Sequence, residues 1–315
     1  MWEVINFCIL LLLLIIILGV LILCIFYYYK IKTYVDEAIS HIGSLIPTFD
    51  PYEFTNIDYS NIGDLTAEDF SDVHFNTKIA LFLCNINMTS YNIFGNFSSR
   101  LPENITLEET IGNNCYIYKY QNILIISYRG TKTGDDVITD LDSAQTEMSG
   151  YPRDVLVHRG FYRLWVPFKD EIKSYIKKHT TEDTKILITG HSLGCASAIF
   201  TGFLLSGSHQ IKLYMFAPPR VGNHHFIRLL NQKMINYAIV NTSDFVPTLP
   251  PVTFPIPGST CLYENFSHRY ITDHQMGSIS LNHRLDTYAC GLNETQNFCK
   301  EPIWKKIPVL MSSNV

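Results

Sequence analysis

A serine in a Gly-x-Ser-x-Gly pattern is the strongest chemical signal in this sequence. An apolar, partly β-branched run at residues 185–189 precedes Gly190, Ser192 and Gly194, and a run of small, helix-forming residues follows them. A strand, a sharp turn and a helix form the context in which such a serine is a nucleophile, and the small flanking residues let strand and helix approach each other. We therefore predict that Ser192 presents a nucleophilic hydroxyl, with the backbone N–H of Leu193 as an oxyanion donor.

A nucleophilic serine also needs a base, and the base needs a carboxylate to orient it. In proteins with this elbow the acid follows the serine in the chain and the histidine comes last. Asp244 directly follows the apolar run 237–241, where a loop can aim it at the site. From this feature alone an Asx turn is an equal alternative. Asp273 and Asp286 are rivals, and we expect neither to follow a buried strand.

Three histidines follow Asp244 and are candidates for the base: His268, His274 and His283. His283 stands near the start of a predicted final helix and is late enough in the chain to fold back over the strand ends. We favour it, with His268 as the fallback. The second oxyanion donor should come from the loop after an early strand. Thr131, which ends the segment Ser-Tyr-Arg-Gly-Thr, offers both an N–H and a hydroxyl there.

The elements that position these residues alternate regularly along the chain. Strands are predicted at 115–120 and 123–128, which form a hairpin, and at 154–158, 185–189, 211–217 and 237–241; helices are predicted at 160–179, 192–205 and 223–233. Such alternation indicates a mainly parallel sheet with helices on both faces and a site at the carboxyl ends of the strands. Upstream, we predict a helix capped by Thr66 that runs to about residue 83, and surface loops over 85–114, which are rich in Asn, Ser, Gly and Thr.

Net charge and cysteine content limit the classes of partner and the covalent links that the chain can have. The chain has 315 residues, a formal net charge of −5 and eight cysteines. Because the chain has no excess of basic residues, nucleic acid is not a predicted partner. Cys195 is predicted to be a free, buried thiol in the helix after the elbow. The five other cysteines downstream of the N-terminal segment could form one or two disulfides, whose connectivity cannot be read from sequence.

The N-terminal segment predicts a membrane anchor. Residues 4–29 contain no charged side chain, and about 24 helical residues span roughly 36 Å, enough for a ~30 Å hydrocarbon layer. A cleaved signal peptide is the alternative, but its apolar core is usually about 7–15 residues. Lys30 and Lys32 favour a cytosolic domain. Asn-x-Ser/Thr sequons favour a lumenal one and begin at Asn87, Asn96, Asn104, Asn241, Asn265 and Asn293. The sequence leaves the side open.

Several segments together resemble the class 3 lipase family. They are Ser-Tyr-Arg-Gly-Thr at 127–131, Val-His-Arg-Gly-Phe at 157–161, the elbow, Pro-Arg-Val-Gly-Asn at 219–223, and Asp-Phe-Val-Pro-Thr-Leu-Pro-Pro at 244–251, followed by His268, His283 and Tyr288. They occur in the family's order across residues 66–291. The resemblance implies an α/β-hydrolase fold, here preceded by an N-terminal transmembrane helix. It also implies a triad of Ser192, Asp244 and His283, with Thr131 and Leu193 as oxyanion residues.

The resemblance further implies a serine hydrolase that cleaves carboxylic esters of lipids, works without a cofactor or metal, and reaches its substrate at a membrane. No feature indicates an obligate protein partner. The segment 132–139, at the position of the fungal lid, is polar, whereas an interfacial lid should be amphipathic. An esterase for small or soluble esters therefore stays an alternative, and so does a non-catalytic binding protein with this fold. The predicted domains are an anchor at 1–32, a linker at 33–62, the hydrolase-like domain at 63–300 and a C-terminal tail at 301–315.

Overall fold

The computed structural model describes residues 73–95, 101–130, 142–256 and 258–293, together with isolated residues at Gly19, Tyr27, Lys30, Phe54, Ile57, Tyr59, Asp69 and Cys299. The chain divides into two compact units, Met1–Asp50 and Pro51–Val315, and only the second is described in any continuous stretch. Of the predicted anchor at 1–32, three single positions are described and the rest lies outside. Among the residues described, no helix is both long and apolar enough to cross a membrane.

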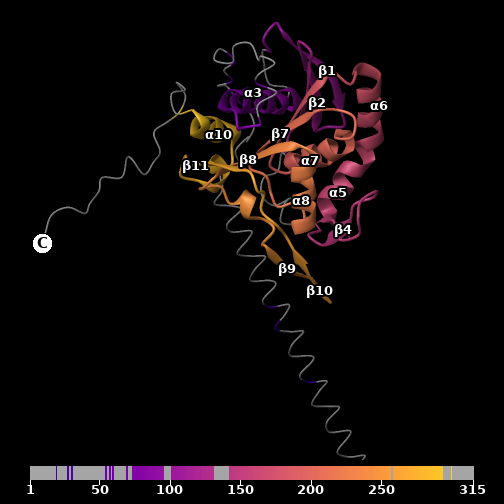
Figure 1. Ribbon diagram of the computed structural model, residues 1–315. Coiled ribbons are helices and arrows are strands. Elements are labelled where there is room, and N and C mark those ends of the chain that lie inside the picture. The colour runs from indigo at the N-terminus through magenta and orange to yellow at the C-terminus, as the bar shows by residue number, and fades with distance from the viewer. Residues whose placement is uncertain are drawn as a thin grey trace, which may run out of the picture. The chain divides into compact units, whose positions relative to one another are not determined.

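A seven-stranded sheet forms the centre of the second unit (Figure 1). Its order is β1-β2-β3-β6-β7-β8-β11. The first three strands pair antiparallel, and every pairing from β3 to β11 is parallel, so the predicted mainly parallel sheet is confirmed. The strand bounds are Ile105–Ile111, Cys115–Tyr120, Ile123–Tyr128, Lys185–His191, Ile211–Phe216, Ile235–Asn241 and Arg269–Thr272.

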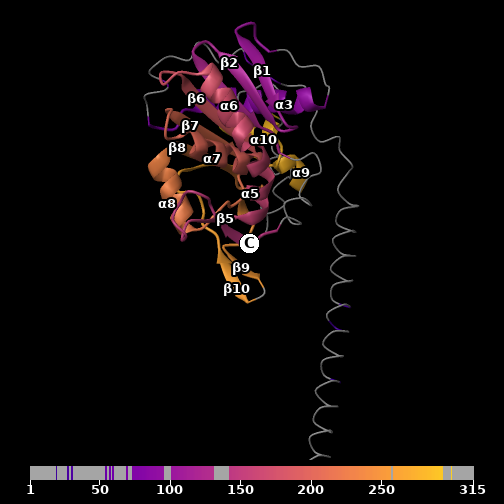
Figure 2. The ribbon, with the colours of Figure 1, turned by 90° about the vertical axis from the view of Figure 1, so that its right-hand side faces the viewer.

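Helices cover both faces of this sheet, as predicted. One face carries α5 (Arg159–Trp165), α6 (Lys169–His179), α7 (Gly194–Leu205) and α8 (His224–Lys233), whose buried side chains share one apolar cluster. The other face carries α3 (Thr77–Phe94) and α10 (Leu285–Leu292), which share a second cluster. Alternate residues of each strand enter the two clusters because successive side chains of a strand point to opposite faces. In Figure 1, α3 and α10 lie on one side of the strands and α5 and α6 on the other, and Figure 2 is viewed from the side of α5 and α6.

Smaller elements border the sheet. Strands β4 (Gln145–Glu147) and β5 (Leu156–His158) pair with each other, as do β9 (Thr253–Ile256) and β10 (Ser259–Leu262). The β9–β10 hairpin projects from the body of the domain in both views (Figures 1 and 2). Short turns of helix occur at η1 (Val166–Phe168), η2 (Val246–Thr248) and α9 (Ile279–Asn282).

Several predicted elements are confirmed with small changes. The hairpin β2–β3 has the predicted bounds. The helix predicted over 160–179 is divided into α5, η1 and α6, and Pro167 lies in the division. Proline has no N–H to donate and clashes with the preceding turn, so it begins a new helical segment instead of continuing the old one.

The surface loop predicted over 85–114 was wrong for residues 85–94, whereas residues 77–83 are helical as predicted and the predicted cap, Thr66, lies outside the described residues. Helix α3 begins at Thr77, where the Asn76 side chain accepts a hydrogen bond from the Ile79 N–H, and it continues to Phe94. Its second half was predicted as surface loop, yet it is almost wholly buried. β1 also lies within the predicted loop region. The polar residues of α3 can be buried because they find partners: Asn92, for example, exchanges two hydrogen bonds with the Phe54 backbone.

Candidate active site

The turn between β6 and α7 places Ser192 in a strained conformation. Its φ is 55°, in the left-handed region that non-glycine residues rarely adopt. The Ser192 N–H donates to the Phe216 carbonyl of the neighbouring strand β7 at 2.9 Å, which holds the turn over the carboxyl ends of the strands. Leu193 follows at the start of α7, where backbone N–H groups lack partners within the helix. Strain of this kind is typical of a serine presented for reaction.

Glycines allow the chain to pack tightly around this turn. A Cβ at Gly190 would lie 2.7 Å from the Gly194 carbonyl oxygen, and a Cβ at Gly194 would overlap the carbonyl oxygens of Tyr128 and Arg129. A Cβ at Gly130 would lie 3.0 Å from the Ser192 Cβ. Larger residues at these positions would force the end of β3 away from the elbow. The predicted role of Gly190 and Gly194 in close approach is thus confirmed.

Asp244 and His283 are in direct contact. The Asp244 Oδ2 lies 2.8 Å from the His283 Nδ1 and accepts a second hydrogen bond from the Tyr288 hydroxyl at 2.7 Å. The other carboxylate oxygen accepts from the Val246 N–H at 3.0 Å. With three donors around it and only 4% of its surface exposed, this carboxylate is held in one orientation. It can therefore hold the imidazole of His283 with Nδ1 protonated and Nε2 as the acceptor.

His283 also lies against the elbow. Its ring centroid is 4.7 Å from that of His191, the residue before Ser192, and its backbone carbonyl accepts from the His191 Nε2 at 2.8 Å. The structure therefore brings the predicted base next to the turn that carries the predicted nucleophile. His191 is fully buried, and this burial, followed by the nearby His283 and Arg284, lowers the pKa of its imidazole well below the usual value.

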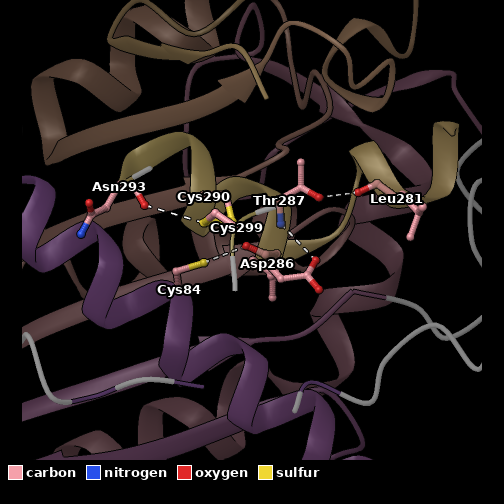
Figure 3. The surroundings of a disulfide bond; sticks show 8 residues. Cys84, Leu281, Asp286, Thr287, Cys290, Asn293 and Cys299 are labelled. Atoms are coloured by element: carbon pink, nitrogen blue, oxygen red, sulfur yellow. Dashed lines mark hydrogen bonds between the residues drawn. A yellow bond between two sulfur atoms is a disulfide. The ribbon is translucent and has the colours of Figure 1, made fainter. Parts of the chain in front are cut away.

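Two short helices position His283. It follows α9 directly, and α10 begins two residues later. Figure 3 shows how these helices are joined: the Thr287 hydroxyl of α10 donates to the Leu281 carbonyl of α9 at 2.6 Å, and a disulfide links Cys290 to Cys299. Cys84 of α3 donates to the carbonyl of Leu285 at the start of α10. α10 is therefore tied at its beginning and near its end.

The loop after β8 holds Asp244 in place. The Asn241 side chain donates to the carbonyls of His274 and Asn282, at 2.9 and 3.2 Å, and so links β8 to the segments before His283. Arg220 donates to the carbonyls of Thr248 and Pro250, which follow Asp244 in the same loop. Burial lowers the pKa of Arg220. These contacts give Arg220 a structural role in the loop that carries Asp244.

The rival residues are occupied elsewhere. His268 is exposed, and its carbonyl pairs with the Ala238 N–H of β8. Asp286 forms an ion pair with Arg284, and Asp273 is exposed and accepts from the Thr242 hydroxyl. A strand does precede Asp273, because β11 ends at Thr272, but β11 is mostly exposed, so the expectation that Asp273 follows no buried strand holds. β11 is the last strand in the sheet order, so its carboxyl end lies at one side of the sheet.

The predicted second oxyanion residue, Thr131, and the polar segment 132–139 lie outside the described residues. The two residues before Thr131 are described and firmly held. Arg129 donates from Nε to the Asn113 carbonyl and from Nη1 to the Gly130 carbonyl, both at 2.7 Å. The guanidinium also lies 3.4 Å above the Phe94 ring. The loop therefore leaves β3 from a fixed starting point.

Three residues of the site were not predicted as such from the sequence: Tyr288, His191 and Tyr91. Tyr288 was named only as part of the family pattern, and its contact with Asp244 requires α10 to fold back over a segment 44 residues away. His191 is a variable position of the elbow pattern, and Tyr91 lay in a predicted surface loop. The Tyr91 hydroxyl lies 2.8 Å from the His191 Nδ1. The two residues are 100 positions apart in the chain, so no local sequence pattern joins them. Among the described residues, no group of His, Cys, Asp and Glu side chains could hold a metal ion.

Comparison with known proteins accords with this geometry. Residues 125–254, from β3 to β9, match the family described as Lipase (class 3). This match identifies residues 125–254 with the class 3 lipase family. The matched region includes Ser192 and Asp244 and ends before His283.

Its relatives include fungal enzymes. The chain is 29% identical over 170 residues to the secreted mono- and diacylglycerol lipase 1 of Fusarium solani, covering 45% of this chain and 51% of that one. It is 32% identical over 108 residues to the secreted mono- and diacylglycerol lipase LIP1 of Malassezia globosa, covering 32% and 36%. The chain thus spans about half the length, or less, of these curated relatives.

Solved structures share the fold. The nonglycosylated LIP2 lipase of Yarrowia lipolytica superposes with a TM-score of 0.53 at 19% identity, covering 69% of this chain and 84% of that one. The lipase of Rhizomucor miehei in complex with its propeptide gives 0.51 at 19% identity, covering 73% and 76%. The predicted α/β-hydrolase fold is therefore confirmed.

Proposed function

We propose that this protein is a serine hydrolase that cleaves carboxylic esters of acylglycerols through Ser192, His283 and Asp244. The observation that carries the proposal is the contact between the buried Asp244 carboxylate and the His283 imidazole, packed against the elbow that carries Ser192. A strained serine, a histidine oriented by a carboxylate and helix N–H groups beside the serine are the parts that acyl transfer needs. The relatives named as mono- and diacylglycerol lipases support acylglycerols as the substrate class.

In the proposed reaction the Ser192 hydroxyl attacks the ester carbonyl carbon and gives its proton to the His283 Nε2. The negative charge on the carbonyl oxygen is stabilised by backbone N–H groups, that of Leu193 and, by the family resemblance, that of Thr131. His283 then protonates the leaving alcohol, and an acyl group stays on Ser192. Water attacks this acyl-enzyme by the same steps and releases the acid. Asp244 stabilises the imidazolium in both halves of the reaction.

The test is the loss of both turnover and labelling at Ser192. Wild-type protein should hydrolyse p-nitrophenyl esters and acylglycerols, and a fluorophosphonate probe should label it at one serine. Ser192→Ala should lose the label and reduce kcat by roughly 10⁴- to 10⁶-fold. Unlabelled wild-type protein without ester hydrolysis would instead favour a binding protein that keeps the fold. Ser197→Ala, which removes a small hydroxyl from α7 five residues after Ser192, is the matched control.

A small or soluble ester is the second candidate substrate class. It is favoured by the polar sequence 132–139 at the position of the fungal lid, because a lid that opens at a lipid surface needs an apolar face. A series of p-nitrophenyl esters from acetate to palmitate separates the two classes. Highest kcat/KM on the long chains supports the acylglycerol enzyme, whereas a preference for acetate supports the small-ester enzyme.

We propose in addition that residues 1–32 anchor the enzyme to a membrane. Support comes from the sequence, in which residues 4–29 carry no charge. An anchor keeps the site near its lipid substrate and so raises the local substrate concentration. The full chain should remain with membranes in alkaline carbonate, whereas a chain beginning at residue 33 should be released. Full-length protein that carbonate extracts would contradict the anchor.

A further inference from the structure

Four polar groups from distant parts of the chain form a continuous line of hydrogen bonds beside the elbow. The Gly130 N–H donates to the Tyr91 hydroxyl oxygen at 2.7 Å, and the same hydroxyl lies 2.8 Å from the His191 Nδ1. On the other side of that ring, Nε2 lies 2.8 Å from the His283 carbonyl oxygen. All these groups are buried. The line thus begins at the turn that leads to Thr131 and ends on the backbone of the predicted base.

The chemistry of the groups fixes every proton in this line. A backbone carbonyl can only accept, so the His191 Nε2 must carry a proton and donate it to His283. The amide of Gly130 can only donate, so the Tyr91 oxygen accepts there. The His191 ring is neutral because it is fully buried, so its Nδ1 has a free lone pair. The Tyr91 hydroxyl can then donate to Nδ1, an arrangement that satisfies every group in the line.

We propose that Tyr91 and His191 are positioning residues, which hold the Gly130 turn and the His283 backbone in register with Ser192. This proposal rests on the proposed hydrolase function. His191 is bonded covalently to Ser192, so its contact with the His283 carbonyl fixes the distance between nucleophile and base. Asp244 holds the same histidine by its ring, and His191 holds it by its backbone. Two attachments at different atoms define both the position and the orientation of the base.

The packing around Gly130 supports the same role. A Cβ at this position would lie 2.7 Å from the Tyr91 hydroxyl oxygen and 3.0 Å from the His191 carbonyl oxygen. Gly130 therefore contacts both the line of hydrogen bonds and the elbow, and there is no room for a side chain at this position. Small displacements matter here, because a shift of about 1 Å in a reacting group can reduce the rate about 10²-fold. The Tyr91 hydroxyl on α3 thus helps to position Gly130, the elbow and the His283 backbone.

The first test compares two buried tyrosines at the interface between α3 and the sheet. Tyr91→Phe removes the hydroxyl from the line, and Tyr118→Phe is the matched control, because the Tyr118 hydroxyl pairs with Ser90, the residue before Tyr91, at 2.9 Å. Both variants should lower Tm by a few degrees. Only Tyr91→Phe should lower kcat, by about 10- to 100-fold with KM within about twofold, and it should slow fluorophosphonate labelling of Ser192 in proportion.

The second test uses rescue at His191. His191→Gln keeps an N–H donor at about the reach of Nε2, whereas His191→Leu has a similar size and no donor. The Gln variant should retain at least about ten times the kcat of the Leu variant when both are corrected for the fraction of folded protein. This comparison stays informative if Tyr91→Phe does not fold.

The outcomes separate the two proposals. If wild-type protein neither turns over esters nor reacts with fluorophosphonate, the hydrolase function is wrong. If wild-type protein is active but Tyr91→Phe has the kcat of Tyr118→Phe, the positioning role is overturned. Equal kcat values for His191→Gln and His191→Leu would also overturn it.

Discussion

The two faces of the central sheet bury different kinds of side chain, although the same strands divide them. The face under α7 is lined mainly by aliphatic and aromatic groups. The face under α3 and α10 also holds hydroxyl, amide and imidazole groups that pair with one another, among them Ser90 with Ser127 and Asn87 with Thr189. Burying polar groups is costly unless they are paired. We infer that the α7 face supplies packing, and that on the α3–α10 face the groups in contact with Asp244, His283 and His191 supply orientation for the site.

Asp244→Asn should give the largest effect and tests the orienting face. An amide cannot accept from Nδ1 and stabilise an imidazolium as a carboxylate does, so kcat should fall roughly 10⁴-fold. Circular dichroism should show an unchanged fold. A kcat within about tenfold of wild type would contradict the orienting role assigned to the α3–α10 face.

Phe200→Ala tests the packing face. Phe200 is buried in α7 with its ring near those of Trp165, Tyr162 and Phe226. Its removal leaves a cavity that should lower the free energy of unfolding by about 3–5 kcal/mol. Urea unfolding measures this loss. The kcat per fluorophosphonate-labelled molecule should stay within about threefold of wild type, and a much larger fall in that ratio would show that this face also orients the site.

A pH prediction concerns His158, a buried histidine on the α7 side that stacks on Phe161 at 3.7 Å. Burial lowers its pKa to about 4, so the neutral form is favoured in the folded protein and the unfolded chain takes up the proton first. The contribution of His158 is complete above about pH 6.5 and is lost as pH falls toward 4, by up to about 3 kcal/mol.

The matched variant for this prediction is His158→Asn. Its side chain can still accept from the Phe161 N–H that caps α5, but it does not titrate. The free energy of unfolding of this variant, measured by urea titration between pH 7 and 4, should depend less on pH than that of wild type. His191 keeps its own contribution in both proteins. Identical pH dependence would show that His158 carries no such linkage.

Tyr288→Phe should lower the rate much less than Asp244→Asn and sharpens the comparison of the two faces. It removes one of three donors to the Asp244 carboxylate and should lower kcat about tenfold. Tyr128→Phe is the control on the opposite face, where the hydroxyl pairs with Thr201 at 2.6 Å. That variant should lose about 1 kcal/mol of stability with kcat unchanged. Equal kcat values in the two variants would mean that the faces do not differ in this way.

The sequence predicted the parts of the site that depend on local chemistry. The elbow at Ser192, the β2–β3 hairpin and the position of Asp244 after β8 follow from residue patterns a few positions long. The contact of His283 with Asp244 was predicted through the family's order of residues, and the spacing alone left three histidines open.

The errors came where distant contacts override local preference. The segment after Leu83 is rich in Asn and Ser, which favour turns, yet it forms the buried half of α3. Its polar groups meet partners on strands that lie 28 to 102 residues away in the chain, such as Tyr118, Ser127 and Thr189. Local sequence preferences carry no information about partners so far away in the chain. For the same reason the roles of Tyr91 and His191 emerged only from the fold.

The hydrogen bonds of Asn241 also bear on how this chain can mature in a cell. Both protons of its amide nitrogen are used inside the domain, on the carbonyls of His274 and Asn282. Asn87 is likewise fully buried, with its amide donating to Thr189. Both residues begin glycosylation sequons, and a sugar attached at either nitrogen would remove a proton or fill a space that the folded domain requires. Glycan transfer at these two asparagines and completion of the fold therefore exclude each other, whereas Asn104, exposed in a turn before β1, is open to modification in the finished domain.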